Sequence, residues 1–197
     1  MSFVVLLAGS PGRQSRSTSL LRRATHELAA HGIAHRLVGI GDLPLQELVY
    51  GASNHPDIQQ FQHDISRADG LIVATPVYKA AYSGVFKLLL DILPERALNG
   101  KAVLPIGVGG SPNHMLAVDY ALKPVLSSLK ARTILEGIYA TENQITYQPD
   151  GTAEFDPDLQ SRLDSGLARF LTSLPQAPAH HNPALLADRI VAAQLGI

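Results

Sequence analysis

The segment between the first apolar run and the first helical pattern is rich in hydroxyl and guanidinium groups. It reads GSPGRQSRSTS over residues 9–19, and it lacks both the GxxxxGK[ST] and the GxGxxG nucleotide-binding patterns. Its side chains and the first free amides of the helix that follows suit a phosphate monoester. The hydroxyl donors are Ser10, Ser15, Ser17, Thr18 and Ser19, and the cations are Arg13 and Arg16. Alternatively, Ser17 only caps the helix and the other hydroxyls belong to a surface turn.

A second segment, ATPVYKAAYSG over residues 74–84, carries a proline and two tyrosines but no acidic residue. Pro76, Tyr78, Lys79 and Tyr82, together with exposed backbone amides, suit a flat heteroaromatic ring with a polar edge. A tyrosine-rich contact between subunits is compatible with the same composition. The missing acidic residues argue against a phospho-accepting receiver domain, which needs aspartates after its first and third strands.

The third unusual segment is GVGGSPNHM, over residues 107–115. Gly109 and Gly110 allow the backbone to approach a ligand closely, where a Cβ would collide. His114 follows them, and it either donates to such a ligand or is a polar surface residue in the first turn of a helix. This segment is therefore a third candidate part of a binding site.

Pro124 interrupts a long helical pattern at residues 113–131. Proline has no amide hydrogen, and in a regular helix its ring clashes with the carbonyl four residues earlier, that of Tyr120, at a cost of about 3 kcal/mol. The nearest relief is an i+5 hydrogen bond from Val125 to that carbonyl, which forms a π-bulge, and such bulges are common at functional sites. We predict a π-bulge around residues 119–124, with a simple proline kink as the alternative.

An alternation of apolar runs and helical patterns must position these segments. Five unbroken apolar runs indicate strands buried on both faces, at residues 3–8, 34–40, 71–75, 102–108 and 133–139. Helical patterns occur at 17–30, 56–68, 83–93, 113–131 and 157–174. This order predicts an α/β fold: a doubly wound, five-stranded parallel sheet of the flavodoxin-like order 2-1-3-4-5 with helices on both faces. Ligands of such sheets bind at the carboxyl ends of the strands, where all three segments lie.

The composition describes one globular domain with balanced charge. The chain has 197 residues, is 46% hydrophobic, carries a formal net charge of -1 and contains no cysteine. The balanced charge does not indicate binding to nucleic acid or to an anionic membrane. No apolar run is long enough to span a bilayer. The N-terminal run also lacks the basic region and the length of a secretory signal. We expect a cytoplasmic protein without thiol chemistry, a metal site, or a nucleic-acid or membrane partner.

Residues 175–197 differ in composition from the domain before them. They read PQAPAHHNPALLADRIVAAQLGI, a proline-rich connector followed by a short helical pattern at 184–195. We assign residues 1–174 to the domain and 175–197 to the connector and helix, which pack on their own domain, pack within the oligomer or stay free. The adjacent His180 and His181 are expected to be solvated rather than to bind metal.

Three strings narrow the interpretation: GSPGRQSRSTSLL, ADGLIVATPVYKAAYSGVFKLLLDILPERAL and GGSPNHMLAVDYALKPVLSSLKA. They resemble the NAD(P)H-dependent FMN reductases that serve alkanesulfonate monooxygenases. The resemblance covers residues 1–174, and the second and third strings are its most specific part. It implies FMN and NADPH or NADH as cofactors and a flavin-dependent monooxygenase as partner.

The resemblance also implies roles for particular residues. The FMN phosphate would lie on the first segment, at Ser10, Arg13, Ser15, Ser17 and Thr18. The isoalloxazine ring would lie along Pro76, Val77, Tyr78 and Lys79, with Gly109, Gly110 and Ser111 at its other edge. Tyr120, close to Pro124, would belong to a helical insertion at a subunit interface, and we expect a homo-oligomer, either a dimer or a homotetramer.

The implied reaction is hydride transfer from the reduced nicotinamide to FMN, with reduced FMN released to a monooxygenase of organosulfur assimilation. Because the two nucleotides carry the chemistry, the protein only positions them and needs no catalytic side chain. Three alternatives stay open: a reductase that retains FMN and reduces quinones, azo dyes or metal oxyanions; a flavodoxin-type electron carrier; and a flavin-free oligomeric scaffold. The near-neutral charge argues against the carrier. The sequence does not distinguish NADPH from NADH.

Overall fold

The structure is a computed structural model that describes residues 2–12, 14–131 and 133–175. Arg13, the predicted helix at 184–195, His180 and His181 lie outside the described residues. Within these limits, the chain forms no helix that is long and apolar enough to cross a lipid bilayer.

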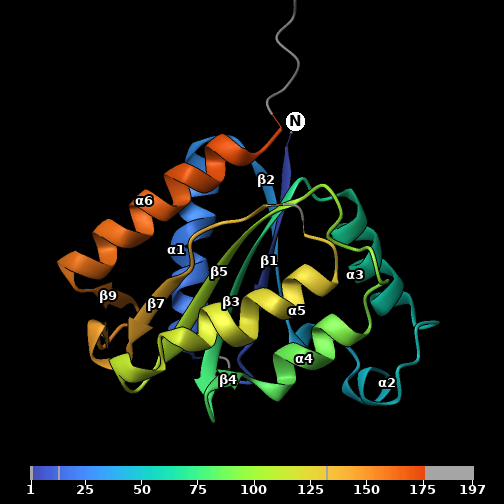
Figure 1. The fold of residues 1–197 in the computed structure, drawn as a ribbon, viewed down its shortest axis with the longest axis horizontal. Helices are drawn as coiled ribbons and strands as arrows, with labels where there is room; N and C mark the ends of the chain where they lie inside the picture. The colour runs from blue at the N-terminus through green and yellow to red at the C-terminus, as the bar shows by residue number, and fades with distance from the viewer. Residues whose placement is uncertain (1, 13, 132, 176–197) are drawn as a thin grey trace, which may run out of the picture.

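A central parallel sheet carries the fold (Figure 1). Its strands are β1 (Phe3–Ala8), β2 (Ala34–Gly39), β3 (Gly70–Tyr78), β5 (Ala102–Gly109), β6 (Thr133–Ile134) and β7 (Ile138–Thr141). The order is β2-β1-β3-β5-β6, and β7 also pairs with β5. This order confirms the predicted doubly wound, flavodoxin-like α/β fold, since β6 and β7 together occupy the place of the fifth strand.

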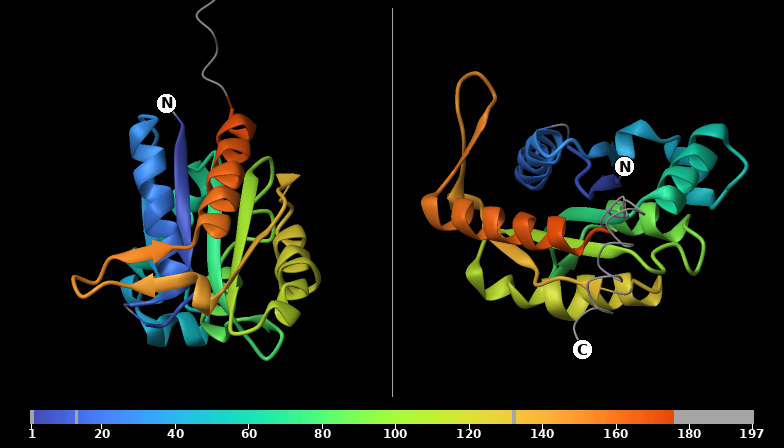
Figure 2. Two further views of the ribbon diagram at one scale, coloured as in Figure 1. Left: turned by 90° about the vertical axis from the view of Figure 1, so that its left-hand side faces the viewer. Right: turned by 90° about the horizontal axis from the view of Figure 1, so that it is seen from above.

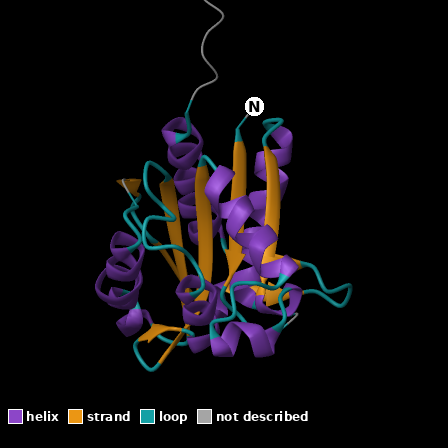
Figure 3. Cartoon of the chain, turned by 90° about the vertical axis from the view of Figure 1, so that its right-hand side faces the viewer, coloured by secondary structure: helices purple, strands orange, loops and turns teal. Residues whose placement is uncertain are grey.

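Helices cover both faces of the sheet (Figures 1 and 3). They are α1 (Arg16–Ala30) and α6 (Pro157–Ser173) on one face, and α3 (Pro56–Arg67), α4 (Gly84–Asp91) and α5 (Lys123–Ser128) on the other. Alternate residues of β1 enter two cores: Leu7 packs with Phe61 and Phe86, whereas Leu6 belongs to the core that contains Phe170. The strands are continuously apolar because helices bury them from both sides.

The fifth strand, predicted at 133–139, is interrupted. β6 pairs with the start of β5 and β7 pairs with its end, while the Leu135 amide still donates to the Val103 carbonyl (2.9 Å). Between the two strands lies Gly137, where a Cβ would collide with the side chain of Val118 from a neighbouring helical segment. The prediction of one continuous strand was wrong here, because an apolar run does not record how closely a helix approaches it.

The helix predicted at 113–131 consists of three segments. They are a 3-10 turn, η2 (Pro112–His114), a π-helix, η3 (Val118–Leu122), and α5. At the end of η3 the Lys123 amide donates to the Val118 carbonyl, five residues earlier. The predicted π-bulge is therefore confirmed. It begins one residue earlier than expected, and the bond at its end joins Lys123 to Val118, whereas the prediction named Val125 and Tyr120. Pro124 lies in the first turn of α5, which continues directly from η3 with helical backbone angles at Leu122 and Lys123.

Several elements were not predicted. At the end of β3 the chain turns back into β4 (Ala81–Tyr82), through Lys79 and Ala80, whose φ angles are 52° and 63°. Asn and Gly usually occupy such a turn, so nothing in the residue types at 79 and 80 indicated this hairpin. The other elements are α2 (Leu45–Tyr50), the 3-10 turns η1 (Ile40–Asp42) and η4 (Glu142–Gln144), and the hairpin of β8 (Ile145–Tyr147) and β9 (Ala153–Phe155). Figure 2 shows that this hairpin crosses the start of α1.

Asp156 caps the N-terminus of α6. Its carboxylate accepts hydrogen bonds from the Leu159 amide (2.7 Å) and the Gln144 side chain (2.9 Å), and these bonds hold the Asp156 pKa below its ordinary value of 3.8. Because the folded-state pKa is the lower one, this stabilisation is complete above the unfolded-state pKa and is lost as the pH falls through the folded-state pKa.

We therefore expect the wild-type protein to lose more stability than Asp156→Asn between about pH 5 and 2, because asparagine still caps the helix but does not titrate. Urea unfolding midpoints across this range measure the difference. Parallel pH profiles of the two proteins would contradict the role given to the carboxylate.

Candidate functional site

A buried hydroxyl cluster joins the segments that follow β1 and β3. The Ser83 hydroxyl donates to the Gly9 carbonyl and accepts from the Phe86 amide (3.0 Å), so it also caps α4. The Ser83 amide donates to the Thr75 hydroxyl (3.0 Å). A Cβ at Gly9 would lie 2.9 Å from atoms of Thr75 and Phe86, which leaves room only for glycine. The carboxyl ends of the two strands are thereby held together.

These two segments line one cavity of about 320 Å³ at the carboxyl edge of the sheet. Six of the predicted site residues line it: Ser10, Ser15, Ser17, Pro76, Val77 and Tyr78. Val108, at the end of β5, also lines it. The sheet thus brings together residues that are more than sixty positions apart in the sequence, as expected for the carboxyl ends of adjacent parallel strands.

The polar part of this cavity is the N-terminus of α1. The helix begins at Arg16, one residue earlier than predicted, and within the described residues its N-cap, Ser15, makes no side-chain capping bond. The Ser15 and Ser17 hydroxyls are 2.9 Å apart, and the first turn has the sequence RSTS, which contains no carboxylate. Free amides, hydroxyls and the positive end of the helix dipole therefore converge on the cavity and suit an anion.

Arg16 also lines the cavity, but its side chain is shared with the opposite segment. The guanidinium donates to the Glu142 carboxylate (3.5 Å) and to the Ile145 carbonyl (3.4 Å). The Arg16 and Glu142 side chains are 41% and 56% exposed, so their ion pair contributes at most about 1 kcal/mol. Arg16 can therefore exchange this partner for a bound anion at little cost.

Six lining residues of this cavity were not among the predicted contacts: Pro11, Gly12, Gln14, Val108, Glu142 and Tyr147. Glu142 and Tyr147 come from η4 and β8, which follow the last strand of the sheet. Ligands of parallel sheets bind at the carboxyl ends of the strands, so the segment after the last strand could have been expected beside the cavity. Its composition, however, is not unusual. The Tyr147 hydroxyl is buried and has no hydrogen-bond partner within the described residues.

The remaining predicted residues do not line this cavity in the described part of the chain. Thr18 is buried inside α1, and Lys79 belongs to the turn between β3 and β4. Gly110 lines a separate cavity of about 750 Å³ beside η3 and β7. No described atom lies within 4 Å of a Cβ built at Gly110.

Gly109 lies in close contact with a side chain of the protein itself. A Cβ at this position would collide with the hydroxyl of Tyr139, which donates to the Ser111 carbonyl (2.6 Å). Burial, with a smaller contribution from the negative charge of Glu142, raises the pKa of Tyr139. The glycine thus makes room for a neutral tyrosine that holds the third segment in place.

An exposed apolar surface lies on the segment that contains η2 and η3. Tyr120 is 79% exposed, and Met115 and Leu116 are each 55% exposed. Tyr120 lies within the π-helix, two residues before its end, whereas Val118 and Leu122 of the same helix are buried. The π-helix thus has a buried side and a side that projects an aromatic ring into solvent.

Comparison with known proteins shows the family of this chain. The profile of the NADPH-dependent FMN reductase family matches residues 2–146. An FMN reductase (NADPH) of Pseudomonas putida is 46% identical over 98% of this chain and 99% of its own length. An FMN reductase (NADPH) of Escherichia coli is 48% identical over 87% of this chain and 89% of its own. The match to the P. putida protein extends into residues 175–197, for which the sequence alone indicated no counterpart.

The fold is also found in a related crystal structure. An NADH:FMN oxidoreductase in its apo form superposes with a TM-score of 0.81 and 35% identity, over 94% of this chain and 99% of that one. The family profile, which matches residues 2–146, covers the three segments at the carboxyl edge of the sheet. The chain therefore belongs to the NADPH-dependent FMN reductase family, whose members are oxidoreductases that use FMN and a reduced nicotinamide nucleotide.

Proposed function

We propose that this chain reduces FMN with NADPH or NADH in the cavity between the segments that follow β1 and β3. One observation carries the proposal: the N-terminus of α1, without a carboxylate in its first turn, meets the apolar end of β3 in a single cavity of about 320 Å³. Ligand sites usually measure about 300–1,000 Å³. One end of the cavity suits a dianionic group and the other suits a flat ring. These two groups are the two halves of FMN.

The residues of the chain bind and orient the nucleotides. When both are bound, the nucleotides supply the chemistry, which is transfer of a hydride from the nicotinamide to the flavin ring. Ser10, Ser15 and Ser17 bind the phosphate with the amides of α1, and we retain Arg13 and Thr18 as further predicted contacts. No side chain needs to gain or lose a proton for this positioning role.

The other predicted residues have separate roles in this proposal. Pro76 and Val77 form an apolar wall for the ring, and Lys79, Gly109, Gly110 and Ser111 stay predictions for its edges. Tyr78 is 55% exposed, so the cavity opens to solvent beside the ring. An open site suits a flavin that leaves as product.

We further propose that reduced FMN leaves this protein to supply a flavin-dependent monooxygenase of organosulfur assimilation, as the sequence resemblance implies. A homo-oligomer, a dimer or tetramer, is supported by the exposed Tyr120, Met115 and Leu116. Contiguous apolar surface of this kind is typical of interfaces between subunits. Pro124 follows the π-helix that presents Tyr120, two residues after its end at Leu122.

Steady-state oxidation of NADPH and NADH with FMN, FAD, riboflavin and a quinone tests the activity. We expect rapid oxidation with free FMN under oxygen and loss of flavin during gel filtration. Background oxidation with every flavin but fast oxidation with the quinone would contradict the proposal and favour an FMN-retaining quinone reductase. Tightly bound flavin without any turnover would favour an electron carrier.

A further inference from the structure

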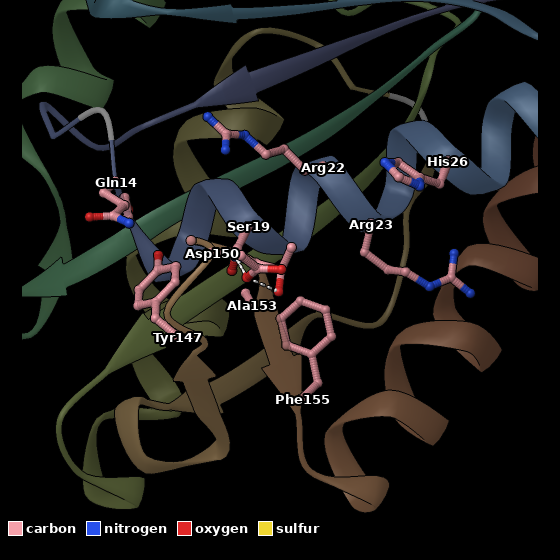
Figure 4. A pocket seen from close by; sticks show the side chains of 12 residues that line it. Gln14, Ser19, Arg22, Arg23, His26, Tyr147, Asp150, Ala153 and Phe155 are labelled. Carbon is pink, nitrogen blue, oxygen red and sulfur yellow. Dashed lines mark hydrogen bonds between the residues drawn. The ribbon is translucent and has the colours of Figure 1, made fainter.

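A second groove adjoins the proposed flavin cavity and has no role in the proposed reaction (Figure 4). It measures about 420 Å³ and lies between α1 and the β8–β9 hairpin. Gln14, Ser15 and Tyr147 line both the groove and the flavin cavity. The groove therefore begins beside the hydroxyls and amides that receive the flavin phosphate in our proposal.

The hairpin provides an aromatic floor with a gap in it. Tyr147 pairs with Ala153 across the two strands, and Phe155 follows Ala153 by two positions, so all three side chains share the face towards α1. Figure 4 shows Ala153 between the two rings. Because Ala153 carries only a methyl group, there is room over it for a flat heterocycle in contact with Tyr147 and Phe155. Stacking on aromatic side chains is a general way to bind a nucleobase.

Polar groups surround this floor. The Tyr147 hydroxyl is buried without a partner among the described residues, so Tyr147 offers its ring rather than its hydroxyl to the groove. Hydrogen bonds from the Thr152 hydroxyl and amide lower the pKa of Asp150, which keeps its carboxylate ionised as an acceptor for sugar hydroxyls or an exocyclic amine. A base with a sugar attached fits this combination.

The positive charges at the groove differ in their availability. Arg23 already pairs with Glu27 and Asp164, both at 2.9 Å. Arg22 also lines the groove, and in the described part of the chain it has no carboxylate within ion-pair distance. Figure 4 shows the Arg22 side chain across α1 from Tyr147 and Phe155, so Arg22 reaches only a phosphate group at the outer edge of the groove.

We infer that this groove is a subsite for the adenosine nucleotide part of a dinucleotide; the inference rests on the proposed position of the flavin phosphate. FAD carries its adenylate on that phosphate, so an occupant that enters the groove from the phosphate end is the adenylate of FAD. The adenosine end of NADPH has the same chemistry and is the other source. The reductase then accepts FAD as well as FMN, or uses the groove to hold NADPH.

Ala153→Phe tests this inference because it fills the gap between the two rings and does not line the flavin cavity. Glu154→Phe is the matched control, since it places the same ring on the opposite, exposed face of β9. We expect Ala153→Phe to raise the KM for FAD at least about tenfold and to leave that for FMN within about twofold. A smaller variant, Ala153→Val, should give an intermediate effect on the same scale if the larger one folds poorly.

The measured constants separate the possible outcomes. A raised KM for FAD alone assigns the groove to the adenylate of FAD, and a raised KM for NADPH with FMN as acceptor assigns it to the dinucleotide donor. Equal effects on FMN, FAD and NADPH, or no effect on any of them in a folded Ala153→Phe protein, would overturn the inference. If the wild-type protein does not oxidise NADPH or NADH with FMN, the proposed function fails instead.

Discussion

Ser15→Asp is expected to raise the KM for FMN by about 30- to 1,000-fold, while the KM for riboflavin stays close to that of the wild-type protein. The estimate takes the repulsion between the new carboxylate and the nearby phosphate as about 2–4 kcal/mol. Ser15 lines the cavity and is the N-cap of α1. Riboflavin has the same ring but no phosphate, so it reports on the ring site alone.

This substitution separates binding from folding. Aspartate is as good an N-cap as serine, and a negative charge at a helix N-terminus is favourable, so the variant should be at least as stable as the wild-type protein. Ser15→Asn is the matched neutral control and should bind FMN within a few-fold of wild type. Steady-state kinetics with both flavins, together with thermal unfolding, measure the effect. Equal changes in the KM values for FMN and riboflavin would contradict the proposed position of the FMN phosphate at this end of the cavity.

Ser83→Ala is expected to lower the free energy of unfolding by about 2–4 kcal/mol and the Tm by about 4–16 °C. The substitution leaves the Gly9 carbonyl and the Phe86 amide without their buried partner. Because the same hydroxyl holds the segment after β1 against the end of β3, we also expect weaker binding of both FMN and riboflavin, well below the unfolding temperature. Ser83→Ala should weaken the binding of FMN and riboflavin to a similar extent, whereas Ser15→Asp should weaken the binding of FMN alone.

The control for Ser83→Ala is Ser128→Ala. The Ser128 hydroxyl donates to the Val125 carbonyl at an exposed position of α5, so its removal should change stability by less than about 0.5 kcal/mol. Urea unfolding and flavin titration of both variants provide the comparison. If Ser83→Ala were as stable as Ser128→Ala, or kept wild-type affinity for riboflavin, the positioning role of Ser83 would be wrong.

Parts of the fold could be predicted because they depend on properties of single residues and their near neighbours in the sequence. β1 has the predicted limits because an apolar run bounded by Gly9 must be buried on both faces of a parallel sheet. The π-helix was predicted because Pro124 lacks an amide hydrogen in any sequence context. The hydroxyls of Ser15 and Ser17 were placed at the binding edge by the order of strands and helices alone.

Other features depend on contacts between distant segments, which leave no mark in the local sequence. Gly109 was identified as a place of close approach, but only the tertiary structure shows that the neighbour is Tyr139. The turn at Lys79 and Ala80 adopts positive φ angles without the residues that usually indicate them. The position of Glu142 beside Arg16 depends on how the chain runs after β7.

The alternation of apolar runs and helical patterns predicted the sheet order and the strand ends at which the candidate binding groups lie, because apolar periodicity and backbone-restricting residues act locally. Which of those groups share a cavity is visible only in the folded chain, as is the groove that forms where the β8–β9 hairpin lies against α1. The physical reason is that side-chain packing between distant segments sets these distances. The type and spacing of residues along the chain do not specify that packing.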